Sequence, residues 1–201
     1  MRCAAVLVAA GSGVRMGAGR PKALMTLGGR PLLAWAADVL MTTPPIETLV
    51  VVGPPGLEAE VFAALGDGDA EVAVVPGGES RSHSVALGLE AVPPSAEYVL
   101  VHDAARPLVS DEVIERVLGG LADGSAGVVP GLPLADTIKA VGSGRVVETV
   151  DRSSLVAVQT PQAFLTERLR AAYAGRTGSA TDCASLVDAT GAPAAVVEGD
   201  P

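Results

Sequence analysis

The chain has 201 residues, of which 49% are hydrophobic and 2% aromatic, and its formal net charge at pH 7 is −9. A chain of this length and apolar content buries a core, which excludes a protein that is disordered throughout. The few aromatic side chains and the negative charge argue against nucleic-acid binding, and no apolar run approaches the ~18 residues of a membrane span. Cys3 and Cys183 match no metal or redox spacing, so we expect reduced thiols in a cytoplasmic protein.

Runs rich in Val, Leu and Ala alternate with helix-like stretches along the chain. Continuous apolar runs are typical of strands that are buried on both faces of a parallel sheet. The predicted strands are 4–10, 48–52, 71–75, 98–102, 127–130 and 194–197, and the predicted helices are 31–41, 57–65, 82–91, 111–121, 166–174 and 181–188. Pro31 is expected at a first helical position and Ser110 as an N-cap. The alternation predicts an α/β fold with a mostly parallel sheet flanked by helices.

Residues 134–164 break this alternation. A short run at 136–139 is followed by a Gly-Ser-Gly turn at 142–144 and a second run at 145–150. This order predicts an extended hairpin without a crossover helix, and such a hairpin often serves as a lid or an arm between subunits. We expect one domain over residues 1–201, with a projecting β-arm at about 134–160.

The first predicted strand leads into a glycine-rich loop, residues 9–22. Residues 1–37 carry several cationic side chains and no acidic one. Ligands of such sheets bind beyond the carboxyl ends of the strands, where small residues let the backbone approach phosphate oxygens. The Walker sequence is absent, and Met16 occupies the third glycine position of the dinucleotide fingerprint. Arg15 and Lys22 therefore favour a polyphosphate site, and the alternative is a solvated loop with incidental charges.

The strand predicted at 98–102 ends in His102 and Asp103, with Arg106 three residues further on. A carboxylate at the end of a central strand is well placed to hold Mg²⁺ against triphosphate oxygens. The alternative is a structural ion pair between Asp103 and Arg106. We expect His102 to lie in the core or to support the site, rather than to act as an acid or base.

A second glycine turn, Gly77-Gly78, follows the strand predicted at 71–75 and precedes a helix. The start of that helix is suited to binding a base or a ribose through backbone and hydroxyl groups. The alternative is a plain capped helix start, with Ser80 or Ser82 as the N-cap. His83, in the first turn, is expected to be exposed.

Together these motifs resemble the 2-C-methyl-D-erythritol 4-phosphate cytidylyltransferases, enzymes of non-mevalonate isoprenoid synthesis. Each matching run is weak alone, but the runs occur in family order over nearly the whole chain. They are A-A-G-x-G-x-R-M at 9–16, P-K at 21–22, G-G-x-x-R-x-x-S-V at 77–85, H-D-A-A-R-P at 102–107, D-T-x-K at 136–139, T-V-D-R at 149–152, T-P-Q at 160–162, T-D at 181–182 and V-E-G at 197–199.

The resemblance implies a Rossmann-like nucleotidyltransferase fold and a homodimer formed through the β-arm. The implied reaction transfers CMP from CTP to 2-C-methyl-D-erythritol 4-phosphate, a sugar-alcohol phosphate, with Mg²⁺ or another divalent cation, and gives 4-CDP-2-C-methyl-D-erythritol and pyrophosphate. Thr137 and Arg152 match arm residues that reach the sugar phosphate in the partner's site. The full set of matching positions is Arg15 and Lys22 as catalytic; Ala9, Ala10, Gly11, Gly13, Gly78, Ser84 and Asp103 for the nucleotide; Asp103, Arg106, Thr137, Arg152, Thr160 and Thr181 for the substrate; and Asp103 for the metal.

The implied chemistry agrees with these residue types. A phosphate monoester has a second pKa of about 6, so the nucleophile is largely dianionic at neutral pH and needs no general base. The barrier is then the approach of two anions. Arg15, Lys22, Arg152 and Mg²⁺ would offset that repulsion and stabilise the departing pyrophosphate.

Two alternatives stay open at this point. Ribitol-5-phosphate cytidylyltransferases share most of these motifs and differ in the acceptor, and a non-catalytic CTP-binding homologue would also keep them. The family pattern continues after V-E-G with an N-I-K segment, whose Lys contributes to sugar-phosphate binding, and no such segment lies within residues 1–201. If the protein ends at Pro201, we expect sugar-phosphate binding to be impaired.

Overall fold

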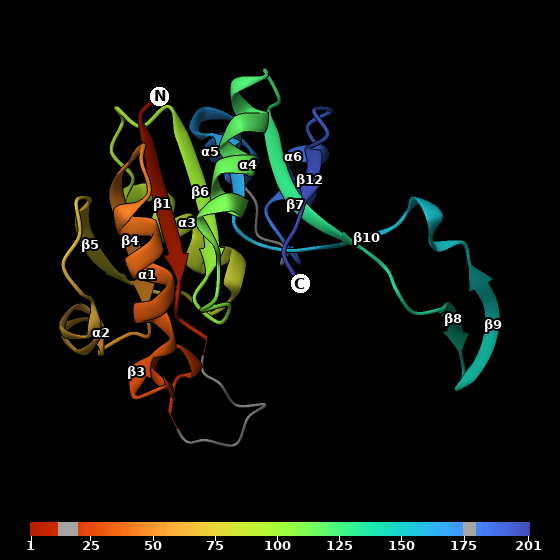
Figure 1. The fold of residues 1–201 in the computed structure, drawn as a ribbon, viewed down its shortest axis with the longest axis horizontal. Coiled ribbons are helices and arrows are strands. Elements are labelled where there is room, and N and C mark those ends of the chain that lie inside the picture. Colours follow the sequence, from red (N-terminus) through yellow and green to blue (C-terminus); the bar gives the residue numbers. More distant parts are fainter. Residues whose placement is uncertain (12–19, 175–179) are drawn as a thin grey trace.

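A computed structural model describes residues 1–11, 20–174 and 180–201. Its centre is a sheet in the order β10-β7-β11-β6-β1-β4-β5, with β12 also paired to β7 (Figure 1). The core of that sheet is parallel, because β1 pairs in parallel with both β4 and β6, and β4 pairs in parallel with β5. These strands are β1 (Cys3–Val8), β4 (Ile46–Gly53), β5 (Glu71–Pro76) and β6 (Tyr98–Asp103), as the apolar runs predicted.

The other half of the sheet mixes directions. Strands β7 (Gly127–Pro133) and β12 (Ala195–Glu198), both predicted, pair in parallel. Strand β11 (Gln162–Leu165) lies antiparallel between β6 and β7, and β10 (Val156–Val158) pairs antiparallel with β7. Neither β10 nor β11 was predicted, since β10 is only three residues long and β11 opens with a polar side chain.

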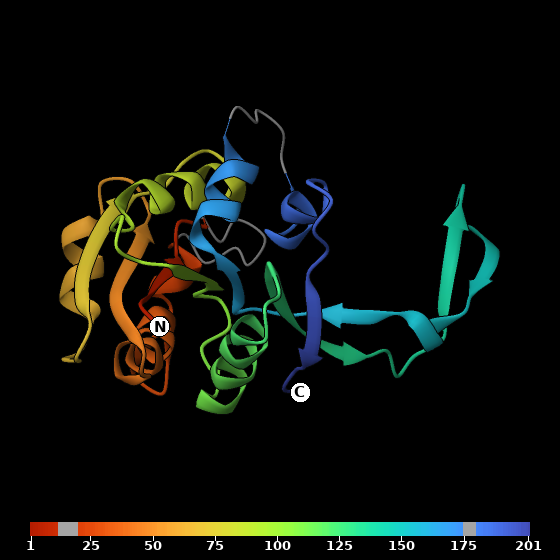
Figure 2. The same cartoon turned by 90° about the horizontal axis from the view of Figure 1, so that it is seen from above.

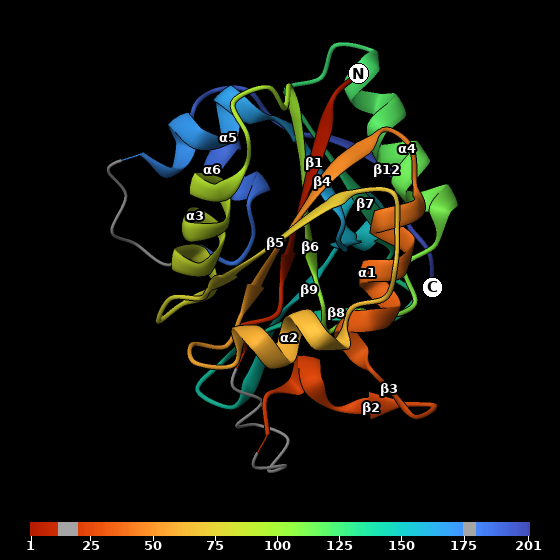
Figure 3. The same cartoon turned by 90° about the vertical axis from the view of Figure 1, so that its left-hand side faces the viewer.

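Helices cover both faces of the sheet (Figure 3). Ala5 and Leu7 of β1 face one apolar cluster, and Ala4 and Val6 face the other, as alternation along a strand requires. The first cluster is completed by α1 (Leu32–Thr42), α2 (Glu58–Ala64) and α4 (Asp111–Ala122), and the second by α3 (Arg81–Ala91), α5 (Thr166–Tyr173) and α6 (Ala184–Asp188). In the described part of the chain, no helix is both long and apolar enough to cross a bilayer.

The predicted helix starts differ from the observed ones by one residue at α1, α2 and α3 and by three residues at α6. Pro31 is the residue before α1 rather than its first residue. Helix α6 begins at Ala184, later than the predicted position 181, and the Asp182 carboxylate accepts a hydrogen bond from the Ser185 amide at 3.1 Å. The Ser110 prediction is confirmed, because its hydroxyl accepts a hydrogen bond from the Val113 amide at 3.4 Å.

The predicted hairpin is present and projects from the sheet (Figure 2). Strands β8 (Ile138–Gly142) and β9 (Arg145–Val150) pair antiparallel, and a short 3-10 helix, η3 (Arg152–Ser154), follows. Ser143 and Gly144 at its tip have φ of 50° and 75°, so the tight reversal uses the left-handed region that glycine adopts at no cost. The segment that leaves the sheet is 134–155, because β10 pairs with β7 again; we call it the arm.

The end of β6 is tied to the β10–β11 connection by a buried histidine. His102 is fully buried; its Nδ1 lies 3.0 Å from Thr160 Oγ1 and its Nε2 lies 3.0 Å from the Arg106 carbonyl oxygen. A carbonyl only accepts, so Nε2 carries the proton and Nδ1 accepts from the Thr160 hydroxyl. The same hydroxyl oxygen accepts from the Asp103 amide at 3.2 Å. The loop that follows β6 is thus held from inside the core, as expected of His102.

We expect acid to destabilise the fold through this histidine. Burial lowers the pKa of His102 from its ordinary 6.5 to about 4, and the hydrogen bond to the Arg106 carbonyl only partly opposes the effect. Between these values the unfolded chain binds the proton and the folded chain does not. Through His102, the free energy of unfolding does not depend on pH above about 6.5. It falls by on the order of 3 kcal/mol as the pH drops toward 4, because protonation favours the unfolded chain.

Urea unfolding at a series of pH values from 7 to 4.5 measures this slope. The carboxylates also contribute to it, so His102→Gln is the comparison. The variant should be less stable at pH 7 and should lose less stability on acidification than the parent. Equal slopes for the two proteins would contradict the buried neutral imidazole.

Candidate active site

The carboxyl ends of the central strands lie together at one edge of the sheet. Val8, the last residue of β1, is in register with Asp103, the last residue of β6. Backbone hydrogen bonds continue past the strand ends, from the Ala9 amide to the Val52 carbonyl at 2.8 Å and from the Ala104 amide to the Val8 carbonyl at 3.0 Å. The start of the predicted glycine-rich loop and the predicted metal carboxylate are therefore neighbours.

The glycine turn after β5 packs directly against this loop. The Gly77 amide donates to the Gly53 carbonyl at 2.8 Å. A Cβ at Gly77 would lie 2.2 Å from the Ala10 Cβ, a separation that non-bonded carbon atoms do not reach. Only glycine fits there, and the fit brings the two predicted nucleotide segments into contact.

The start of α3 confirms the capped helix start, and binding of a base or a ribose at this turn stays a prediction. The Ser80 hydroxyl accepts from the His83 amide at 3.1 Å, so Ser80 is the N-cap and His83 is exposed, as expected. The Ser84 hydroxyl oxygen accepts from the Gly78 amide at 3.1 Å. Ser82 instead bonds to the backbone of Ala180, which sequence reasoning missed.

Asp103 is paired with an arginine, but not with the one expected. Its Oδ1 accepts from Arg81 Nε at 3.0 Å and lies 3.0 Å from Arg81 Nη2. The Arg106 side chain is exposed, while its amide donates to the Asp103 carbonyl oxygen at 2.9 Å. The structural ion pair of the alternative exists with a different partner, from α3. Arg81 lies inside the G-G-x-x-R run, so the motif was visible but the pairing was not.

Two more polar residues near the site also went unassigned in the sequence. Gln162 is buried; its Oε1 accepts from the Cys183 amide at 3.1 Å and its Nε2 donates to Asp182 at 3.0 Å. These contacts join β11 to the start of α6. Both residues lie in matched runs, T-P-Q and T-D, which was the available signal. Of the predicted substrate residues in these runs, Thr160 is buried with its hydroxyl bonded to Asp103 and His102, and Thr181 is exposed.

The predicted catalytic cations are only partly described. Arg15 and Gly13 lie outside the described residues, whereas Gly11 is exposed. Lys22 is half-buried and opens a short 3-10 helix, η2 (Lys22–Leu24), whose carboxyl end leads to the small hairpin of β2 (Thr26–Leu27) and β3 (Arg30–Pro31). Within the described residues, Lys22 forms no ion pair.

Asp103 is the carboxylate predicted to hold a metal at this edge. In the described part of the chain, no cluster of three or more His, Cys, Asp or Glu side chains could hold a metal ion. Mg²⁺ in phosphate-transfer sites is commonly bound by one or two carboxylates together with the phosphates of the substrate. The half-exposed Asp103 fits that pattern as a ligand that acts only with a bound nucleotide.

The two predicted arm residues lie apart from this edge within one chain. Thr137 and Arg152 are exposed on the arm, and the Arg152 guanidinium donates to the Ala135 carbonyl. Figure 1 shows the arm extending away from β1 and β6. The structure therefore groups Ala9, Ala10, Gly78, Ser84 and Asp103, and separates them from the arm.

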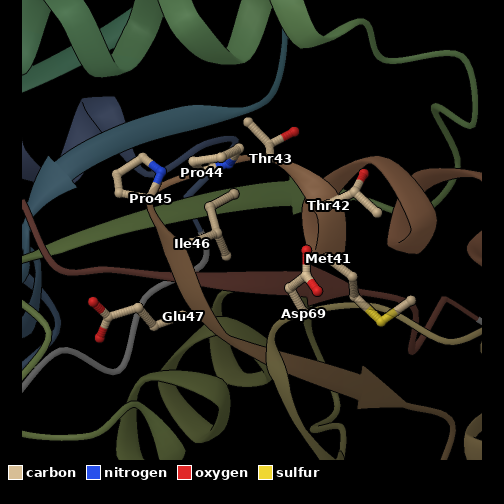
Figure 4. Close-up of a pocket in the computed structure, with 8 residues that line it drawn as sticks. All are labelled: Met41, Thr42, Thr43, Pro44, Pro45, Ile46, Glu47 and Asp69. Carbon is tan, nitrogen blue, oxygen red and sulfur yellow. The ribbon is translucent and has the colours of Figure 1, made fainter.

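A hollow of about 300 Å³ elsewhere on the molecule is not part of this site (Figure 4). It is lined by residues 41–47 and Asp69, around the first residue of β4. Ile46 is in register with the start of β1, so the hollow lies at the amino ends of the strands, opposite the edge that carries Asp103.

Comparisons with known proteins show the family of the chain. The family model for 2-C-methyl-D-erythritol 4-phosphate cytidylyltransferase matches residues 3–201. The protein of that name from Streptomyces avermitilis is 47% identical over 210 residues, which cover 98% of this chain and 84% of the relative. The one from Rhodococcus opacus is 46% identical over 198 residues, which cover 98% of this chain and 86% of the relative.

Solved structures show the same fold. The Thermus thermophilus 2-C-methyl-D-erythritol 4-phosphate cytidylyltransferase superposes with a TM-score of 0.77 at 38% identity, over 100% of this chain and 90% of the other. The 4-diphosphocytidyl-2C-methyl-D-erythritol synthase from Anaerococcus prevotii superposes with a TM-score of 0.86 at 28% identity, over 99% and 87%. The chain therefore belongs to the 2-C-methyl-D-erythritol 4-phosphate cytidylyltransferase family.

Proposed function

We propose that the edge formed by β1, β5 and β6 binds CTP and transfers its CMP group to 2-C-methyl-D-erythritol 4-phosphate. The products are 4-CDP-2-C-methyl-D-erythritol and pyrophosphate, in the non-mevalonate route to isoprenoids. The observation that carries the proposal is the contact between Ala10 and Gly77. It joins the start of the glycine-rich loop to the Gly77-Gly78 turn, beside Asp103. Membership of the family supports the same reaction.

In this proposal the backbone of the two turns binds the nucleotide. The residues assigned to CTP are Ala9, Ala10, Gly11, Gly13, Gly78 and Ser84, and small side chains there let amide groups approach the ligand. The hydrogen bond between the Gly78 amide and the Ser84 hydroxyl fixes the turn before CTP arrives. A turn that is already ordered loses less entropy on binding than a flexible one.

The chain's own groups act by charge and position. The acceptor phosphate is its own nucleophile, so no side chain has to remove a proton. Lys22 and Arg15 neutralise the phosphates of CTP as the bond to pyrophosphate breaks, and Asp103 and Arg106 hold the acceptor. Asp103 would also hold Mg²⁺, which supplies positive charge to the triphosphate when it is bound.

We further propose a homodimer in which each arm completes the partner's site, within one nucleotidyltransferase domain of residues 1–201. The arm carries Thr137 and Arg152 away from the edge of its own chain, and three of its valines, Val141, Val146 and Val147, are 62–67% exposed. Apolar side chains grouped on a projecting hairpin suit burial against a second copy. A cytoplasmic location is proposed as well, since Cys3 and Cys183 are free and buried.

Pyrophosphate release tests the reaction directly. The protein is mixed with CTP, Mg²⁺ and 2-C-methyl-D-erythritol 4-phosphate, with ribitol 5-phosphate in a parallel assay. We expect release with the first acceptor only. Release with ribitol 5-phosphate alone would assign the other acceptor, and CTP binding without release from either would assign a non-catalytic role.

Lys22→Ala should lower kcat at least ~10²-fold, which is the scale for losing one preorganised charge contact to a transition state. Steady-state kinetics with saturating CTP measure the change. Arg168→Ala is the matched control, because Arg168 is an exposed cation on α5 and should leave kcat unchanged. Near-normal turnover of the Lys22 variant would remove Lys22 from the catalytic machinery.

Arg152→Ala should raise the KM for the sugar-alcohol phosphate and leave the KM for CTP close to that of the parent. The reason is that Arg152 contacts only the acceptor phosphate in the proposed complex, and a lost charged contact weakens ground-state binding. Varying each substrate at a saturating level of the other separates the two constants. A change confined to the CTP constant would contradict the assignment.

Mixing subunits tests whether the arm serves the partner. A heterodimer of one Lys22→Ala chain and one Arg152→Ala chain, purified through two different tags, has one intact site if the arms exchange. At low acceptor concentration it should show about half the parent activity, far above either variant homodimer, because a two-fold dimer places both defects in one site. Activity no higher than the homodimers would mean that each arm serves its own chain.

A further inference from the structure

We propose that Arg81 is a positioning residue for Asp103, which it holds by one carboxylate oxygen so that the other stays available to the metal. The inference deepens the proposed function and rests on the assignment of Asp103 as the metal ligand. Arg81 is not among the residues that the family resemblance assigned to the site.

Arg81 approaches Asp103 through the Nε side of its guanidinium and contacts only one of the two carboxylate oxygens. Arg81 Nε donates to Asp103 Oδ1 at 3.0 Å, and Nη2 lies 3.0 Å from the same oxygen. Among the described residues, Oδ2 accepts no hydrogen bond. The planar guanidinium has donors in a rigid fork, so two contacts to one oxygen restrict the rotation of the carboxylate. One oxygen is engaged, and Oδ2 is the ligand atom left for a cation.

The guanidinium is itself held from its far side. Arg81 Nη1 lies 3.8 Å from Cys183 Sγ, and the Tyr173 hydroxyl lies 3.4 Å from the same sulfur. Cys183 is fully buried, and burial raises the pKa of its thiol above the ordinary value, so the sulfur is neutral at physiological pH. A neutral sulfur accepts a weak hydrogen bond from Nη1 and does not compete with Asp103 for the positive charge.

The neighbours of Arg81 make it a link between two parts of the site. It is the first residue of α3, directly after the N-cap Ser80, and three residues before Ser84, which fixes the Gly78 amide. Its side chain contacts Asp103, the last residue of β6, and Cys183, the N-cap of α6. The arginine thus couples the glycine turn proposed for CTP to the carboxylate proposed for the metal, and its side chain is only 25% exposed.

Lysine is a poor substitute at this position. Its single ammonium group cannot contact the carboxylate through two fixed donors and reach the sulfur with a third. Removing the outer partner of a metal ligand typically costs 10–100-fold in metal affinity or activity. Arg81→Lys should therefore weaken metal binding although the positive charge is kept.

The test compares CTP affinity with and without Mg²⁺, by isothermal titration calorimetry in the absence of acceptor. The ratio of the two dissociation constants measures the metal-linked gain, and the value without metal reports on the glycine turns alone. We expect Arg81→Lys to reduce that gain ~10-fold or more and to change the metal-free constant little. Cys183→Ala, which keeps Arg81 and removes one of its supports, should reduce the gain in the same direction by less.

Arg170→Gln is the matched control. Arg170 is a partly buried arginine that also stabilises α3, but at the other end, where its Nη2 donates to the carbonyls of Leu89 and Val92 at 3.2 and 2.6 Å. Its loss should lower the melting temperature and leave the metal-linked gain unchanged. This separates a positioning role from a general loss of stability.

Two results would overturn the inference, and they are distinguishable. Arg81 has no positioning role toward the metal if Asp103→Asn abolishes the metal-linked gain in CTP affinity and Arg81→Lys keeps it. The same conclusion holds if Arg81→Lys weakens CTP binding equally with and without Mg²⁺. If Asp103→Asn itself keeps the gain, the assignment of Asp103 as metal ligand is wrong and the inference about Arg81 falls with it.

Discussion

The parallel register of β1 with β6 is the constraint on which the candidate site depends. It sets Val8 beside Asp103, so a loop rich in small residues and a carboxylate emerge next to each other. Both strands are buried on both faces, which leaves their ends as the only places where polar groups meet solvent without a desolvation cost. The place of the polar groups at this edge is therefore a consequence of how the core is packed.

Buried polar groups then hold the ends of the strands in one arrangement. His102 and Thr160 tie the loop after β6 to the chain that enters β11, and Gln162 ties β11 to the start of α6. Each of these groups is satisfied by a defined partner, and such networks specify a single conformation more strongly than apolar contacts do. Under the proposed function, a site that must place two anions in line benefits from a single conformation.

The two groups of predicted site residues lie on different parts of the molecule, the edge of the sheet and the projecting arm. The edge carries groups suited to a polyphosphate and a cation, whereas the arm carries Thr137 and Arg152 outward on an exposed hairpin. In a two-fold dimer such an arm lets the acceptor be contacted from a second chain. Under the proposed function, nucleotide and acceptor are thus bound by different elements of the chain.

Much of this could be predicted from the order of residues along the chain. Continuous apolar runs indicated β1, β4, β5, β6, β7 and β12. A strand that is buried on both faces has apolar residues at successive positions, whereas a strand with one exposed face alternates apolar and polar residues. The break in the pattern after residue 133 indicated the hairpin, and the ordered motifs indicated the family. Strand β11 was not predicted, because the polar residue Gln162 at its start is more typical of a loop. In the structure the Gln162 side chain is buried and accepts a hydrogen bond from the amide of Cys183, the N-cap of α6.

The sequence by itself determined the fold class, the family and the positions at which small or charged residues recur, because these depend on local pattern and spacing. Only the tertiary structure decided which of those residues meet. Arg81 and Asp103 are 22 positions apart, and Gln162 and Asp182 are 20 apart, so no local rule joins them. The pairing of Asp103 with Arg81 rather than Arg106 follows from the packing of α3 against the sheet, which brings a guanidinium to the carboxylate from a different element.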